Sequence, residues 1–170
     1  MQDMQVSQKS STSKLGELSP EAQRLYAHEC RIRNAFASNF KEQRPLERVL
    51  SCETRYTATA LRADLRSVDR TGLLREWEFK IQADHYVLGQ ILTYVAYARQ
   101  EMRFRPVRGV IASFSFTDDL RMAIEVMNLN IELVTVPQWM SSAGRIPNLG
   151  AKAPKIPSIP QLDKTAQLKK

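Results

Sequence analysis

The segment from Thr59 to Lys80 constrains the fold most, because it has the pattern of two strands joined by a tight turn. Asp69 and Gly72 stand at the first and last positions of a type I turn, and glycine tolerates the left-handed conformation that closes a three-residue hairpin loop. With residues 70–72 as the loop, Asp69 faces Leu73, and the pairing farther along the hairpin follows by counting. The segment therefore predicts an antiparallel hairpin of defined register.

This register places the charged side chains on one face of the hairpin, because residues two apart on a strand share a face. The predicted polar face has three cross-strand pairs, which are Arg66 with Glu76, Asp64 with Glu78, and Arg62 with Lys80. The other face carries the apolar residues Leu61, Ala63, Leu65, Trp77, Phe79 and Ile81. The apolar alternation thus indicates the same register as the turn.

Two opposed carboxylates on this face need a physical reason. Asp64 and Glu78 would have Cβ atoms about 4.5 to 5.5 Å apart, a spacing at which their charges repel. A divalent cation removes the repulsion, since Mg²⁺ is bound by one or two carboxylates together with water and phosphate oxygens. Lys80 on the same face would hold or deprotonate an attacking water and offset charge on a phosphate. These are the groups needed for phosphodiester hydrolysis.

The residue pattern alone leaves a plainer alternative open. An antiparallel hairpin commonly keeps one polar, solvated face, and the charges would then be an ordinary polar network. In either case Arg66 and Glu76 are predicted to form an exposed ion pair worth a few tenths of a kcal/mol.

Asp64 followed by Glu78-Phe79-Lys80 resembles the D…(D/E)xK signature of the PD-(D/E)xK nuclease superfamily. The stretch from Gln90 to Tyr94 is similar to the QxxxY motif that follows the catalytic lysine in RecB-type and NucS-type members. The order of elements from about residue 20 to 137 also resembles NucS-like nuclease domains. One departure is Ala63, which stands before Asp64 where the superfamily frequently has proline. Another is Glu76, an extra acid on the same face, for which two alternatives are open: it competes with Glu78, or it only pairs with Arg66.

The resemblance implies an α/β, restriction-endonuclease-like fold, with a mixed sheet flanked by helices and led by the catalytic hairpin. It implies a metal-dependent DNA nuclease with Mg²⁺ as cofactor, Mn²⁺ as a substitute, and the catalytic residues Asp64, Glu78, Lys80, Gln90 and Tyr94. Asp64 and Glu78 would be the metal ligands. A second hypothesis is a catalytically inactive protein of this fold that serves as a DNA-binding or scaffold subunit of a larger complex.

The resemblance also implies a carboxylate near the metal on the first core helix. Glu29 is the first candidate for this third metal ligand, and Glu47 is the alternative. From the residues alone, Glu29 is equally well explained as an exposed acid that pairs with Arg33 one turn later.

The remaining elements follow from caps and periodicity. Ser19 and Pro20 predict the start of a helix that extends to about residue 40, Pro45 predicts a helix start or turn within 43–52, and a strand begins between 53 and 59. Next come a helix over 85–101 capped by Asp84, a buried strand over 107–116, a helix capped by Thr117, and a strand over 131–136. The last three predict a crossover and a parallel pair. Gly89 within its helix predicts a close approach of that helix to the sheet.

Composition predicts one domain, residues 19–140, between two disordered segments. Residues 1–18 lack an apolar period, and the proline-rich tail 141–170 has six Lys or Arg against one Asp, so it carries +5 of the net charge of +7. The sequence predicts a soluble protein, because it has neither an apolar run long enough to span a bilayer nor the apolar core of a signal peptide. Cys30 and Cys52 are isolated, which predicts reduced thiols in a cytoplasmic protein.

The positive charge favours DNA as the partner, with no membrane contact. Three roles stay open for the tail: holding nucleic acid, docking on a protein partner through its Ile-Pro steps at 146, 156 and 159, or keeping the chain in solution. A homodimer is also left open.

Overall fold

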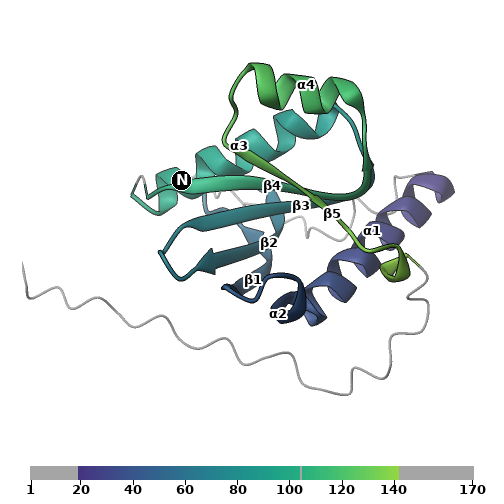
Figure 1. Ribbon diagram of the computed structural model, residues 1–170, viewed down its shortest axis with the longest axis horizontal. Helices are drawn as coiled ribbons and strands as arrows, with labels where there is room; N and C mark the ends of the chain where they lie inside the picture. The colour runs from purple at the N-terminus through teal and green to yellow at the C-terminus, as the bar shows by residue number, and fades with distance from the viewer. Residues whose placement is uncertain (1–18, 104, 142–170) are drawn as a thin grey trace, which may run out of the picture.

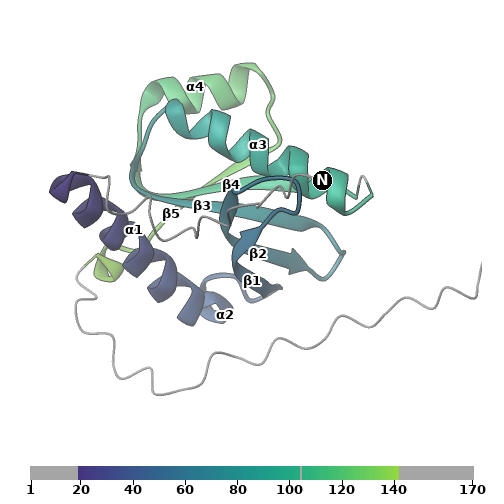
Figure 2. The same ribbon diagram turned by 180° about the vertical axis from the view of Figure 1, so that it is seen from behind.

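The computed structural model describes residues 19–103 and 105–141, so the predicted segment 1–18 and almost all of the predicted tail lie outside the described residues. Five strands form one mixed sheet in the order β1-β2-β3-β4-β5, with α1 and α2 on one side and α3 and α4 on the other (Figures 1 and 2). The elements are α1 (Pro20–Ser38), α2 (Phe40–Gln43), β1 (Glu47–Arg55), β2 (Arg62–Asp69), β3 (Leu74–Ala83), α3 (Tyr86–Glu101), β4 (Val107–Phe116), α4 (Asp118–Val126), β5 (Ile131–Thr135) and the short 3-10 turn η3 (Gln138–Met140). The predicted restriction-endonuclease-like fold is confirmed.

The β2–β3 hairpin has the predicted register from its turn to Leu65, where the ladder ends before the predicted pairs Asp64–Glu78 and Arg62–Lys80. Leu65 pairs with Trp77 and Arg66 with Glu76, and the Asp69 N–H donates to the Leu73 carbonyl at 3.2 Å. Gly72 has a φ of 86°, the left-handed conformation that the turn requires. The turn chemistry and the two-residue period were therefore sufficient to align the two strands.

The other pairings complete the mixed sheet. β1 is antiparallel to β2, whereas β3 is parallel to β4 and β4 is parallel to β5, as predicted for the last pair. Thr117 caps α4 by accepting a hydrogen bond from the Leu120 N–H, so Asp118 and Asp119 in the first turn have the predicted capping position. No helix in residues 19–103 and 105–141 is both long and apolar enough to cross a membrane.

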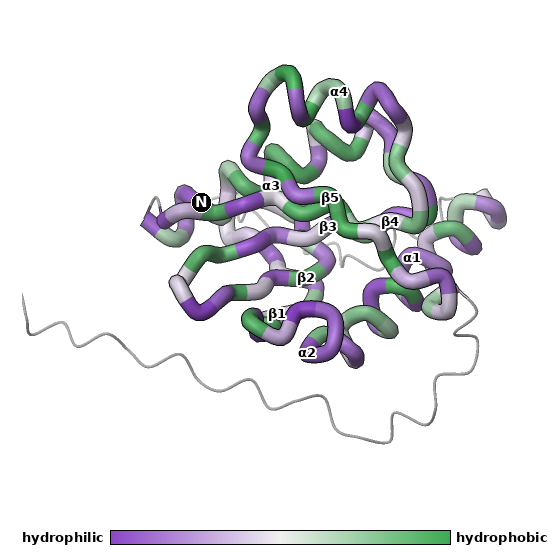
Figure 3. The backbone as a smooth tube through the Cα atoms, in the orientation of Figure 1, coloured by the Kyte–Doolittle hydropathy of each residue, from purple (hydrophilic) through white to green (hydrophobic). Residues whose placement is uncertain are grey.

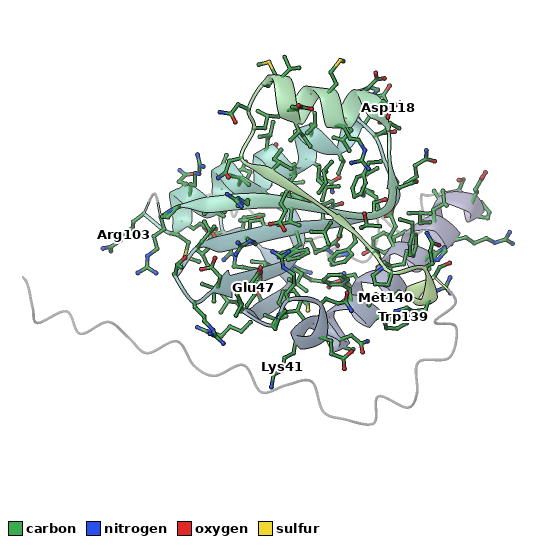
Figure 4. The ribbon with its side chains drawn as sticks, in the orientation of Figure 1. Lys41, Glu47, Arg103, Asp118, Trp139 and Met140 are labelled. Atoms are coloured by element: carbon green, nitrogen blue, oxygen red, sulfur yellow. The ribbon has the colours of Figure 1, made fainter. Side chains whose placement is uncertain are left out.

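Each face of the sheet buries its own core. Under α1, the ring of Phe36 packs against the rings of Trp77 and Phe79, with centroid distances of 5.5 and 5.4 Å. Met140 of η3 (Figure 4) belongs to the same core. On the other face, α3 covers β3 and β4 with residues such as Ile91. Hydrophobic residues (green) gather along the middle of the molecule, where β4 and β5 cross it (Figure 3). The two cores hold α1 and α3 on opposite sides of β3.

The first helix ends at Ser38, close to its predicted end, and the side-chain N–H of Asn39 after it donates to the Ala35 carbonyl at 2.8 Å. Of the two alternatives for Pro45, the turn is confirmed. The strand predicted to begin between 53 and 59 was wrong, because β1 begins at Glu47, ends at Arg55 and runs beside β2. Pairing with a neighbouring strand outweighs the weak local preference of this segment.

Three finer predictions were also wrong. Gly89 is exposed and has open space around it, whereas a Cβ on Gly109 would lie 2.8 Å from Ile91, so the close approach of α3 to the sheet is at Gly109. Ala63 packs in the core under α3 and Leu61 is 43% exposed, so neither shares the face of Leu65. The pairing of β2 with β3 ends at Leu65, so earlier residues of β2 do not follow the hairpin's alternation. The N-cap of α3 is His85 and not Asp84, although the Asp84 carboxylate accepts the Tyr86 N–H at 2.9 Å.

Candidate active site

A cleft of about 260 Å³ brings the predicted site residues together. It lies where α1 and α3 meet the strands β2 and β3, and Asp64, Glu78, Lys80, Gln90, Tyr94 and Glu29 all line it. Its remaining walls come from Tyr26, Cys30, Ala60, Leu61 and Arg62. Cys30 and Cys52 are free thiols.

Asp64 lies where the two strands of the hairpin part. Its Oδ2 accepts the Phe79 N–H at 2.8 Å, so a carboxylate takes the place that a β2 carbonyl would have in a continued ladder. Its Oδ1 lies 3.6 Å from Arg33 Nη1. Burial raises the pKa of Asp64, although the Phe79 N–H and the charge of Arg33 oppose the rise. The backbone N–H of Phe79 on β3 thus fixes the orientation of the Asp64 carboxylate through its Oδ2.

Glu78 and Lys80 project from β3 into the same cleft. Lys80 Nζ donates to Glu78 Oε1 at 2.7 Å. Burial and the charge of Asp64 raise the pKa of Glu78, which is 3% exposed. Burial lowers the pKa of Lys80, but the negative charges of Glu78 and Glu29 outweigh it and raise that pKa overall. Lys80 is therefore a cation here, which favours holding water and offsetting charge over acting as a base.

Glu29, and not Glu47, is the helix carboxylate at the cleft. Its Oε2 lies 3.6 Å from Lys80 Nζ, and burial raises its pKa. The alternative pairing with Arg33 is wrong, because Arg33 instead contacts Glu53 and Asp64. Glu47 lies on β1, with Arg44 at 2.5 Å and Arg75 at 3.6 Å, and does not line the cleft (Figure 4).

Gln90 and Tyr94 are neighbours on α3, as the helical spacing predicted. Gln90 Nε2 donates to the Tyr94 hydroxyl at 2.7 Å, and the Tyr94 ring stacks on Tyr56 with centroids 5.8 Å apart. Burial, with the charge of Glu78, raises the pKa of Tyr94 to about 12. Its hydroxyl therefore stays neutral and keeps a hydrogen-bonding role at the rim.

The pair Arg66 and Glu76, predicted to be exposed, is buried. Arg66 is 6% and Glu76 0% exposed, with Arg66 Nε donating to Glu76 Oε1 at 2.5 Å. The Tyr56 hydroxyl donates to Glu76 Oε2 at 3.1 Å. Glu76 does not line the cleft, so it is no competitor of Glu78.

The sequence did not predict a role for Arg62, which lines the cleft, or for Arg33 and Glu53, which contact Asp64 and Arg62 beside it. Arg33 follows Glu29 by one helical turn, and that spacing was a usable signal. No local signal pointed to Glu53, whose contacts depend on how β1 lies against α1 and β2.

The donor set suits Mg²⁺ or Mn²⁺ held by two carboxylates. Within residues 19–103 and 105–141, no group of three or more His, Cys, Asp and Glu side chains could hold a metal ion alone. Asp64 and Glu78 nevertheless face one cleft with raised pKa values, and a cation there would relieve the repulsion between them. Mg²⁺ usually completes such a site with water and phosphate oxygens.

Comparison with known proteins was informative at the level of structure alone. Neither models of known protein families nor curated proteins match this chain. Among solved structures, an EndoMS complex with double-stranded DNA matches 64% of this chain with a TM-score of 0.54 and 21% identity. EndoMS in its apo form matches 64% with a TM-score of 0.51 and 23% identity. A repair endonuclease from Pyrococcus abyssi matches 61% with a TM-score of 0.50 and 22% identity.

The match covers 45% to 47% of those proteins, so this chain spans less than half of their length. The likeness is one of fold and not of close sequence. The chain shares its restriction-endonuclease-like fold with these three structures, as the motif resemblance implied.

Proposed function

We propose that this chain is a metal-dependent DNA nuclease that hydrolyses phosphodiester bonds. The observation that carries the proposal is the convergence of Asp64, Glu78 and Lys80 in one cleft. The fold supports it, since one structure that shares it is described as a repair endonuclease and another is an EndoMS complex with double-stranded DNA. DNA as partner, Mg²⁺ dependence and a cytoplasmic location are parts of the proposal.

Each residue has a role that its surroundings support. Asp64 and Glu78 would hold Mg²⁺, or Mn²⁺ in its place. Glu29, predicted as a third metal ligand, would instead keep Lys80 in position from α1, because no three such side chains of the described residues are grouped so that they could hold a metal ion. The metal would supply positive charge to the phosphate and lower the pKa of a bound water. Lys80, a cation, would orient the attacking water and offset charge that develops on the phosphate oxygens. Gln90 and Tyr94 would support the rim through their mutual hydrogen bond.

Incubation of the purified chain with plasmid and with labelled oligonucleotides, in Mg²⁺, Mn²⁺ or EDTA, tests the proposal. We expect cleavage with either metal and none in EDTA. Asp64→Asn, Glu78→Gln and Lys80→Met should each reduce turnover by about two orders of magnitude or more, because all three act at the bond being broken. Asp118→Asn is the matched control, since Asp118 lies in the first turn of α4 and outside the cleft.

Near wild-type turnover in one of the three variants would remove that residue from the mechanism. DNA binding without cleavage in either metal would instead favour the inactive DNA-binding or scaffold subunit. A protein partner and a homodimer stay predictions, to be tested by measuring the mass of the particle in solution.

A further inference from the structure

Glu53 has a backbone conformation that no helix end explains. Three non-glycine residues in the described part of the chain have positive φ: Glu53 at 51°, Arg103 at 53° and Asn128 at 47°. Arg103 and Asn128 each follow the C-cap of a helix, where the left-handed conformation is common. Glu53 lies inside β1, and such a residue persists in this conformation only where its surroundings hold it.

What holds Glu53 is a pair of arginines. Its Oε1 accepts from Arg33 Nη1 at 2.9 Å and its Oε2 from Arg62 Nη1 at 3.2 Å, so each carboxylate oxygen has its own guanidinium. The side chain of Glu53 is 39% exposed, so it is accessible from solvent. Arg62 also contacts the Tyr26 hydroxyl, which helps to keep its guanidinium in place.

The two arginines lie beside the candidate catalytic carboxylate. Arg33 Nη1 is 3.6 Å from Asp64 Oδ1, and its side chain is 8% exposed. Arg33 is further held by Asn34, whose Oδ1 accepts from its Nε and Nη2 at 3.1 Å. Arg62 lines the cleft and is 35% exposed. One oriented guanidinium group thus lines the cleft, and a second lies behind it beside Asp64.

A DNA phosphate has the same chemistry as the group that these arginines now hold. Its two non-bridging oxygens share a negative charge, and guanidinium groups bind such oxygens with directed hydrogen bonds. We propose that Arg33 and Arg62 form a phosphate subsite next to the cleavage position, and that Glu53 occupies it in the free protein and is displaced when DNA binds. This inference rests on the proposed function only in taking DNA as the ligand.

The proposal predicts that Glu53 opposes DNA binding. With its carboxylate in place, the positive charges of both arginines are compensated before DNA arrives. Removing the carboxylate frees Arg62 and the face of Arg33 that Glu53 covers for a phosphate, so affinity should rise. Removing Arg62 deletes one of the two phosphate contacts, so affinity and its salt dependence should both fall.

Equilibrium binding of a fluorescent oligonucleotide to the full chain, in EDTA so that no cleavage occurs, tests this at several salt concentrations. We expect Glu53→Gln and Glu53→Asn to bind about three- to tenfold more tightly at low salt. Arg62→Gln should bind about tenfold more weakly, with a log-log salt slope smaller by roughly 0.7 to 0.9. Glu132→Gln is the matched control with unchanged affinity, because Glu132 also contacts two arginines, Arg44 and Arg75, but outside the cleft.

Equal affinity of both Glu53 variants and the wild type would overturn the subsite, and so would an Arg62→Gln variant with unchanged affinity and slope. Thermal melting checks that each variant is folded. Asparagine adopts positive φ more readily than glutamine does, so Glu53→Asn protects the test against a folding defect of Glu53→Gln. The outcome is separate from the proposed function: the predicted affinity changes in a chain that cleaves nothing would keep the subsite and reject the nuclease.

Discussion

Arg66 and Glu76 show how much the environment of a residue depends on what covers it. Their opposition across the hairpin follows from sequence, but α3 and Tyr56 close over that face and bury both charges. Burial raises the pKa of Glu76 to about 7, while the charge of Arg66 opposes the rise. The pair is thus a buried structural contact and not a solvated one.

Exchanging the two charges, by Glu76→Arg with Arg66→Glu, should therefore destabilise the fold, because the Tyr56 hydroxyl donates to a carboxylate on β3. The single change Glu76→Gln should cost about 3 to 5 kcal/mol, since it leaves the Arg66 guanidinium buried without a counter-charge. Urea unfolding at about pH 8, where Glu76 is ionised, measures both. Glu21→Gln, at an exposed position of α1, is the control and should stay within about 0.5 kcal/mol. A destabilisation below about 1 kcal/mol in Glu76→Gln would show that the pair is solvated after all.

Asp69 carries the pH dependence of the hairpin turn. The Thr71 hydroxyl and then Arg75 hold the pKa of this carboxyl far below its usual range. A carboxyl with a lowered pKa in the folded state contributes stability above its unfolded pKa of about 3.9 and loses it as the pH falls. Asp69→Asn should therefore be less stable than the wild type by a constant amount above about pH 5, and the gap should narrow below about pH 4. Unfolding curves across this range decide it, and a gap that does not depend on pH would contradict the assignment.

At the scale of elements, the contact between α3 and β4 positions the side of the cleft that Gln90 and Tyr94 form. Gly109 allows Ile91 to approach the backbone of β4, and Ile91 is the direct neighbour of Gln90. The resemblance identified the QxxxY-like motif on α3, but the residue that lets this helix pack closely on the sheet is Gly109 on β4. The position of Gln90 and Tyr94 therefore depends on a small residue elsewhere in the chain.

Alanine at the two glycines should have opposite effects. Gly109→Ala places a Cβ 2.8 Å from Ile91 Cγ1 and 3.3 Å from Val95 Cγ2, so it should cost about 1 to 3 kcal/mol of stability and lower turnover by displacing α3. Gly89→Ala meets open space in a helix and should stabilise by about 0.5 to 1 kcal/mol. Thermal melting and a cleavage assay on both variants test this. Equal melting temperatures of the two variants would mean that Gly109 does not determine how closely α3 packs on the sheet.

At the scale of the whole molecule, the cleft forms where the distant helix α1 meets three consecutive elements, β2, β3 and α3. α1 supplies Glu29, β2 supplies Asp64, β3 supplies Glu78 and Lys80, and α3 supplies the rim. The residues that follow Ser141 lie outside the described structure, but their sequence holds +5 of the net charge of +7. Charge of this kind would add affinity for DNA by releasing counterions and would not add chemistry.

Truncation after Met140 should therefore weaken DNA binding at low salt and flatten its salt dependence, by roughly 0.7 to 0.9 in the log-log slope for each DNA phosphate that the segment would have neutralised. Turnover at saturating DNA should change little, since all the candidate catalytic residues lie between Asp64 and Tyr94. Replacing the six Lys and Arg of this segment by Gln in the full chain is the control that separates charge from length. Unchanged affinity and slope would exclude a DNA contact and make a protein partner for the Ile-Pro steps the better hypothesis.

The hairpin register, the caps of α1 and α4 and the pairing of Gln90 with Tyr94 were determined by the sequence alone. Each depends on residues a few positions apart, where turn chemistry, capping and periodicity act directly. The choice of Glu29 over Glu47, the burial of Glu76 and the strained position of Glu53 were decided by the tertiary structure. Each of these depends on which surface covers a side chain, and that surface comes from segments that are distant in the chain.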